Sequence, residues 1–165
     1  MLLKQLIGGQ YRLENRKLKK KYSKEQLKII LVQTSLSLLK SKSWPQISLK
    51  KICAQAKIDY SIVYTFVKEK KDILILINNY FDQETMKSVK HLDKSSSRDN
   101  IFESFMIKFD SYTQHRVAVI KLFDYIFKKP DLILFLLPAK IKFINNILEF
   151  SNVTSDGIIG KLKSE

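Results

Sequence analysis

The chain has 165 residues, with 30 Lys+Arg against 16 Asp+Glu and a formal net charge of +14. Its 45% hydrophobic content is ordinary for a globular protein and excludes a chain that is disordered throughout. The single Cys excludes an intrachain disulfide and a zinc site made of cysteines alone, and the two His residues are too far apart for metal-ligand spacing.

The positive charge is concentrated in the first half of the chain. Residues 1–75 hold 17 Lys/Arg and 5 Asp/Glu, a net charge of +12, whereas residues 76–165 hold 13 and 11, a net charge of +2. This imbalance predicts a module that binds a polyanion, followed by a nearly neutral module.

Charges and capping signals place the first expected elements. Residues 1–22 carry many charges with little apolar periodicity, and we expect a basic N-terminal arm there. Ser23 and Gln26 form a capping-box pattern that starts a helix over 24–40. No stretch of the chain shows the alternation that is typical of a strand, so an all-α protein is expected.

Further helices are expected along the rest of the chain. Ser48 and Asp59 are candidate N-caps of two short helices joined by a tight turn. Pro138 is expected to kink or split the last helix. The expected helices after the first cover residues 49–56, 60–67, 70–87, 101–115, 116–129 and 131–150.

Enzymatic and membrane functions find no support in the sequence. No glycine lies between Gly9 and Gly157, so loops that cradle a phosphate at a strand–helix turn are not expected. We find no nucleophile–base pair, carboxylate dyad or metal set, and expect neither an enzyme nor a cofactor or metal. The most apolar stretch, 132–148, is interrupted by polar residues and predicts a buried helix in a cytoplasmic protein.

The expected helix over 60–67 separates polar and apolar side chains cleanly. At about 100° per residue, Tyr60, Ser61, Tyr64, Thr65 and Lys68 fall within about 140° of one another, and the apolar residues fall on the opposite side. Hydroxyls can bond to base edges or phosphates, and lysine neutralises phosphate. The pattern fits a recognition helix in a DNA major groove, although an ordinary amphipathic surface helix has the same pattern.

Twelve positions between residues 29 and 74 fit one helix-turn-helix pattern, in register and without gaps: Trp44, Ser48, Leu49, Ile52, Cys53, Ala56, Ile58, Asp59, Val63, Tyr64, Val67 and Lys70. With these positions, residues 29–74 resemble the DNA-binding domain of TetR/AcrR-family transcriptional regulators. The resemblance implies an N-terminal helix-turn-helix domain over 23–71 and a helical regulatory and dimerisation domain over 72–165.

The resemblance also implies the residues that touch DNA. They are Ser48, Tyr60, Ser61, Tyr64, Thr65 and Lys70, to which Lys50 is added on charge alone. Two of these residues have other possible roles: Tyr64 could be a packing residue, and Lys70 could be a solvated residue at the start of a helix.

Three positions depart from the family pattern. Lys57 replaces the glycine of the turn, which costs about 1 kcal/mol if the position needs a positive φ. Lys68 replaces a proline and Lys51 replaces an acidic residue. All three changes add positive charge around the expected recognition helix.

The resemblance further implies a repressor that binds a palindromic operator in double-stranded DNA as a homodimer and is released by a small effector. The part after the DNA-binding domain is short for the family. Seven aromatic residues there are candidates for an apolar ligand pocket, although ordinary core packing is the simpler interpretation: Phe102, Phe105, Phe109, Tyr112, Phe123, Phe127 and Phe143.

A second hypothesis gives the same fold another function. Residues 105–161 faintly resemble the C-terminal part of TetR-fold accessory proteins of ubiquinone biosynthesis, which implies binding of a lipid or isoprenoid without an operator. The net charge of +12 in residues 1–75 argues for DNA, although an anionic membrane surface would also attract it.

Overall fold

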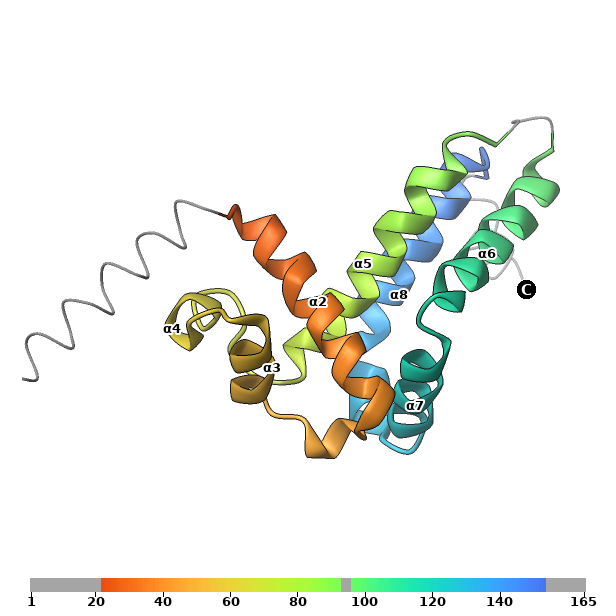
Figure 1. Cartoon of the computed structure of the whole chain (residues 1–165). Helices are drawn as coiled ribbons and strands as arrows, with labels where there is room; N and C mark the ends of the chain where they lie inside the picture. Colours follow the sequence, from red (N-terminus) through yellow and green to blue (C-terminus); the bar gives the residue numbers. More distant parts are fainter. Residues whose placement is uncertain (1–21, 93–95, 154–165) are drawn as a thin grey trace, which may run out of the picture. The chain divides into compact units, whose positions relative to one another are not determined.

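The computed structural model describes residues 22–92 and 96–153, and every element in these ranges is helical (Figure 1). The expected all-α class is confirmed. The expected arm over 1–22 lies outside the described residues except for Tyr22. In chain order the elements are α2 (Lys24–Ser41), the 3₁₀ helix η1 (Trp44–Gln46), α3 (Leu49–Ala56), α4 (Tyr60–Val63), α5 (Asp72–Val89), α6 (Ser97–Thr113), α7 (Arg116–Phe127) and α8 (Pro130–Phe150).

The chain divides into two compact units between Leu76 and Ile77, inside α5. The expected domain boundary after residue 71 lies five residues earlier. The first unit contains α2, η1, α3, α4 and the start of α5. The second contains the rest of α5 with α6, α7 and α8.

The first unit begins with the expected capping box. The Ser23 amide donates to Gln26 Oε1 at 2.8 Å, and the Gln26 amide donates to Ser23 Oγ at 3.2 Å. This exchange satisfies two backbone donors that would otherwise lack partners at the start of α2. Helices α2 and α3 then pack together around side chains with no exposed surface: Leu31, Leu36, Leu39, Ile52, Val63 and Val67.

A buried ion pair connects helices of the second unit. Lys108 of α6 pairs with Asp82 of α5, and their side chains are only 6% and 15% exposed. Asn78 Nδ2 donates to the second oxygen of the Asp82 carboxylate at 2.6 Å. The Lys108 ammonium also lies 4.5 Å from the centre of the Phe143 ring of α8. Burial lowers the pKa of Lys108 to about 8, although its bond to Asp82 acts in the opposite direction.

Helix α6 places polar residues inside and aromatic residues outside. Its buried residues are Asn100, Ser104 and Lys108. Phe102 and Phe109 are each 62% exposed. The ion pair explains this orientation in part, because turning the aromatic residues inward would separate Lys108 from Asp82.

Helix α8 starts and ends close to where the sequence predicts. Pro130 occupies its first turn, where a backbone amide would have no partner within the helix, so the missing amide hydrogen costs no hydrogen bond. The helix then runs unbroken to Phe150, so of the two expected effects of Pro138, a kink or a split, the split is not observed. Pro138 is exposed.

Candidate nucleic-acid interface

The turn between α3 and α4 requires a backbone conformation that lysine adopts at a cost. Lys57 has φ 54° and ψ 38°, in the left-handed region. The Ile58 amide donates to Cys53 O at 3.0 Å and the Lys57 amide donates to Ala54 O at 3.2 Å, which is the hydrogen-bond pattern of a Schellman motif. The position therefore does need a positive φ, and Lys57 costs about 1 kcal/mol relative to a glycine.

Helix α4 is shorter than expected. Asp59 caps it, as predicted, through a 2.7 Å bond from the Ser61 amide to its carboxylate. Regular α-helix ends at Val63, and tighter bonds continue the turn, from the Thr65 amide to Ile62 O and from the Phe66 amide to Val63 O. The expected helix over 60–67 is thus a short α-helix followed by a 3₁₀-like turn.

The two sides of this segment are separated as the angular analysis predicts. Ile62, Val63 and Val67 are buried against the first unit's core, and Phe66 is half-buried. The opposite side is exposed to solvent and contains Tyr60, Ser61, Tyr64, Thr65 and Lys68.

Two tyrosines and a lysine form an ordered row on the exposed side, which we call the Tyr60–Tyr64–Lys68 row. The rings of Tyr60 and Tyr64 stack with centroids 5.8 Å apart. The Lys68 ammonium lies 4.4 Å from the Tyr64 ring centre and donates to Tyr64 O at 2.7 Å. Tyr60 and Tyr64 are 37% and 47% exposed, so their faces are held in place while remaining open to a ligand.

The nearby hydroxyls differ in what they can still offer. Thr65 Oγ1 donates to Ile62 O at 2.7 Å, so this hydroxyl can only accept a further bond. Ser48 Oγ accepts from the Lys51 amide at 3.2 Å, which leaves its hydrogen available for a phosphate. Lys50 is exposed on α3.

Lys70 has a structural role that the sequence did not predict. Its ammonium donates to Trp44 O and to Ile47 O, both at 2.9 Å, and lies 4.8 Å from the centre of the Trp44 ring. Burial lowers its pKa. Two of its three N–H groups are thus occupied, and one remains for a phosphate. No sequence signal indicated this, because the partners are carbonyls 26 and 23 residues upstream.

The aromatic residues expected in a ligand pocket do not surround one cavity. Phe143 is buried, Tyr112 and Phe123 are half-buried, and Phe127 is 72% exposed. Edge contacts join Phe81 to Tyr112 at 4.8 Å and Tyr112 to Phe123 at 5.7 Å. The remaining three are exposed on α6, with Phe105 in contact with Phe143: Phe102, Phe105 and Phe109.

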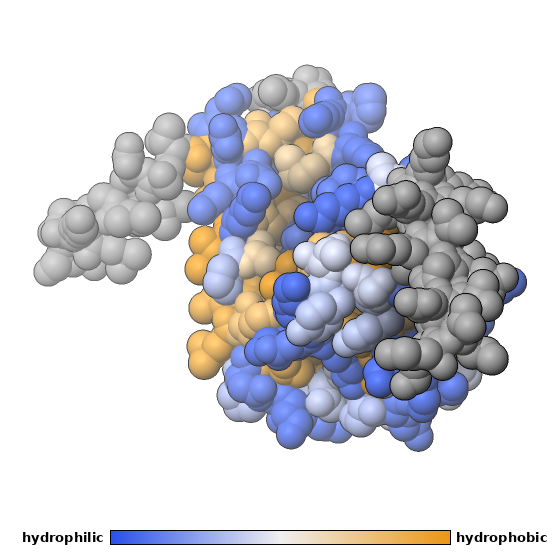
Figure 2. Space-filling view, turned by 90° about the vertical axis from the view of Figure 1, so that its left-hand side faces the viewer, coloured by the Kyte–Doolittle hydropathy of each residue, from blue (hydrophilic) through white to orange (hydrophobic). Residues whose placement is uncertain are grey.

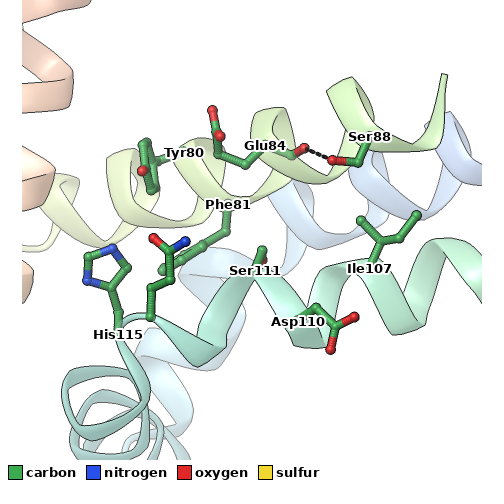
Figure 3. Close-up of a pocket in the computed structure, with 9 residues that line it drawn as sticks. Tyr80, Phe81, Glu84, Ser88, Ile107, Asp110, Ser111 and His115 are labelled. Atoms are coloured by element: carbon green, nitrogen blue, oxygen red, sulfur yellow. Dashed lines mark hydrogen bonds between the residues drawn. The ribbon is translucent and has the colours of Figure 1, made fainter. Parts of the chain in front are cut away.

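The second unit nevertheless has hollows between its helices. One, of about 330 Å³, lies between α5 and α6, and the ring of Phe81 points from α5 toward α6 at one end of it (Figure 3). None of the seven predicted aromatic residues lines it. Another, of about 320 Å³, lies between α5 and α8, and Phe143 contributes to its wall with Asp82 and Lys142.

The described residues contain no group of three or more His, Cys, Asp or Glu side chains that could hold a metal ion. No helix within them has both the length and the hydropathy to cross a membrane. Burial raises the pKa of the Cys53 thiol to about 11, so it is protonated at neutral pH.

The chain was compared with family models, curated proteins and solved structures. No family model, no curated protein and no solved structure matches it.

Proposed function

We propose that the chain is a TetR-type transcriptional regulator, a repressor that inserts the segment 60–67 into the major groove of its operator. The observation that carries the proposal is the Tyr60–Tyr64–Lys68 row. It lies on the exposed side of a segment whose other side is buried, directly after a tight turn from α3.

The chemistry of this surface suits double-stranded DNA. A helix fits the major groove of B-DNA, where base edges present donors and acceptors that hydroxyl groups can read. Tyr60, Tyr64 and Ser61 offer such groups. Lys50, Lys57 and Lys68 are exposed around them and add the charge that phosphates attract.

The remaining parts of the proposal follow the family resemblance. The protein acts in the cytoplasm as a homodimer on a palindromic operator, because two helix-turn-helix units read two half-sites. A small apolar effector held by the second unit releases DNA. The hollow beside Phe143 offers such a molecule one aromatic wall, although amide and charged side chains make up most of its lining.

The test is a titration of duplex fragments from the region upstream of the protein's own gene, at several salt concentrations. A preference for one palindromic fragment and a steep fall in affinity with salt are expected. The variant Lys50→Ala/Lys68→Ala should reduce the salt slope by about 2, whereas Lys128→Ala/Lys129→Ala, which removes the same charge from exposed positions between α7 and α8, should not. If both double variants reduced the salt slope equally, the binding would be non-specific attraction between charges, which contradicts the proposal.

One observation favours the second hypothesis, binding of a lipid or isoprenoid without an operator. Phe102, Phe109 and Phe127 each expose more than 60% of their surface. Mass spectrometry of the purified protein tests this directly. A stoichiometric lipid, together with no preference among DNA fragments, supports the second hypothesis over the first.

A further inference from the structure

The second unit exposes an unusual amount of hydrophobic surface. Figure 2 shows hydrophobic side chains gathered in an upright band on the left of that view. On α6 and α8, nine large apolar side chains are between 36% and 68% exposed, and we call them the apolar face: Phe102, Phe105, Met106, Phe109, Ile133, Leu134, Leu137, Ile141 and Ile144.

On α8 the exposed apolar residues form a sector separate from the buried one. Taking Ile133 as zero and about 100° per residue, the exposed apolar residues fall between about 0° and 100°. Leu132, Leu136, Phe143 and Ile147, which are buried, fall between about 260° and 320°. Every residue of α8 in the exposed sector is apolar. A helix that faced only its own unit on one side and water on the other would be polar in that sector.

The exposed residues of α6 lie on the same side of the unit. Lys108 and Tyr112 of α6 contact α5, and Phe105 contacts Phe143 of α8. Around the axis of α6, Phe105 lies between Lys108, which contacts α5, and Phe109, which is exposed. The exposed sector of α6 therefore begins at Phe105, beside α8, and extends away from α5. Helices α6 and α8 are neighbours, and their exposed sectors therefore form one continuous face opposite α5.

The size of the apolar face matches a protein–protein interface. At their observed exposures, nine side chains of this size offer on the order of 900 Å². Each partner in a standard interface buries about 800 Å², whereas the largest apolar patch of a typical monomer is about 300–600 Å².

The charges beside the face are mixed, because Lys140 and Lys142 flank the apolar sector of α8 and carboxylates flank that of α6. Three exposed carboxylates of α6, those of Asp99, Glu103 and Asp110, follow the apolar sector along one edge. Anionic lipid headgroups would be repelled by these carboxylates and attracted by the lysines, so charge does not single out a membrane as the partner. The chain's own residues 154–165 are a poor cover, because Ile158, Ile159 and Leu162 are their only large apolar residues.

We propose that two copies of this chain pair through the apolar face of α6 and α8. The choice of a second copy rests on the proposed function, because one helix-turn-helix reads one half-site and the other half-site needs a second. Pairing would bury both apolar faces at once, with the same residues on each side of a two-fold axis.

The test measures the mass of the full chain by sedimentation at micromolar concentration. Wild type should have twice the 19.3 kDa of one chain. Leu137→Glu and Ile141→Glu should each weaken the dimer at least about 100-fold, because a carboxylate would be buried without a partner. Asn145→Glu adds the same charge to an exposed position just outside the apolar sector and should leave the dimer intact. Circular dichroism checks the helix content of each variant, and Leu137→Ala gives a milder second reading.

A monomeric wild type overturns the inference, and so does a dimer that both glutamate variants leave unchanged. The measurement needs no DNA, which separates it from the proposed function. If wild type is a dimer that the glutamate variants dissociate, but it binds no operator, the proposed interface is supported and the proposed function is contradicted. If wild type is a monomer that binds an operator, the proposed function is supported and the proposed interface is contradicted.

Discussion

The ammonium of Lys70 lies over the indole of Trp44 and bonds to the carbonyl of the same residue, at 4.8 Å and 2.9 Å respectively. A second bond, to Ile47 O, holds the end of the segment that follows η1. The residue expected to touch a phosphate thus fastens the connection between α2 and α3 to the start of α5.

Removing this ammonium should destabilise the first unit. Lys70→Met keeps an unbranched apolar side chain on Trp44 but leaves two carbonyls without their charged donor, which we expect to cost about 2 kcal/mol. Trp44 is the single tryptophan and is buried, so its fluorescence during urea unfolding reports on the first unit. Lys71→Met, at a neighbour whose side chain is 44% exposed and pairs with Glu69, should change the free energy of unfolding by less than about 0.5 kcal/mol. If Lys70→Met unfolds like wild type but binds operator DNA more weakly, phosphate contact is its main role.

The ring and the hydroxyl of Tyr64, in the segment 60–67 proposed to enter the major groove, can be tested separately. Tyr64→Phe preserves the stacking on Tyr60 and the contact with Lys68, and removing the hydroxyl should cost about 1 kcal/mol, or roughly 5-fold, in operator affinity. Tyr64→Ala removes the ring as well and should lose more. Fluorescence anisotropy with a labelled operator measures both, and Trp44 fluorescence checks the fold. Wild-type affinity in both variants would show that the DNA surface lies elsewhere.

The turn between α3 and α4 should tolerate a change that stabilises it. Lys57→Gly replaces a lysine held at φ 54° with the residue that adopts this conformation without steric cost. The free energy of unfolding of the first unit should rise by about 1 kcal/mol. Lys50→Gly, at an exposed position inside α3, should lower it by about the same amount. A loss of stability in Lys57→Gly would mean that the lysine side chain contributes more than its backbone strain costs.

Local signals in the sequence predicted most of the first unit. The Ser23–Gln26 capping box and the Asp59 cap both depend on residues within a few positions of one another. Such features are set by neighbouring backbone groups, which the sequence displays directly. The angular separation of residues 60–67 also appears in the structure, although the regular helix is shorter.

The parts that the sequence did not predict depend on residues far apart. Lys70 bonds to carbonyls more than twenty residues upstream, and no periodicity encodes that contact. On α6, apolar spacing grouped the aromatic residues on one side, but both interpretations placed that side inside the protein, and Phe102 and Phe109 are exposed instead. The Lys108–Asp82 pair, which also spans 26 residues, places the polar side inside.

That pair should make stability depend on pH. Burial lowers the pKa of Lys108 to about 8 in the folded protein, below the roughly 10.4 of an unfolded chain. Between these values the unfolded chain binds more protons, so the free energy of unfolding should rise with pH, by up to about 1.4 kcal/mol per unit. Below pH 8 this contribution is lost, because folding then buries a charged amine.

Comparison with Lys108→Met isolates this effect, because Cys53 and other groups titrate in both proteins. At pH 7 the variant should be less stable by about 3 kcal/mol, since Asp82 keeps its charge and loses its partner. Between pH 8 and 10 wild type should gain stability relative to the variant. Circular dichroism during urea unfolding follows the helices, and Trp44 fluorescence serves as the control in the first unit. A difference between the two proteins that stays constant from pH 7 to 10 would show that Lys108 keeps its proton throughout this range.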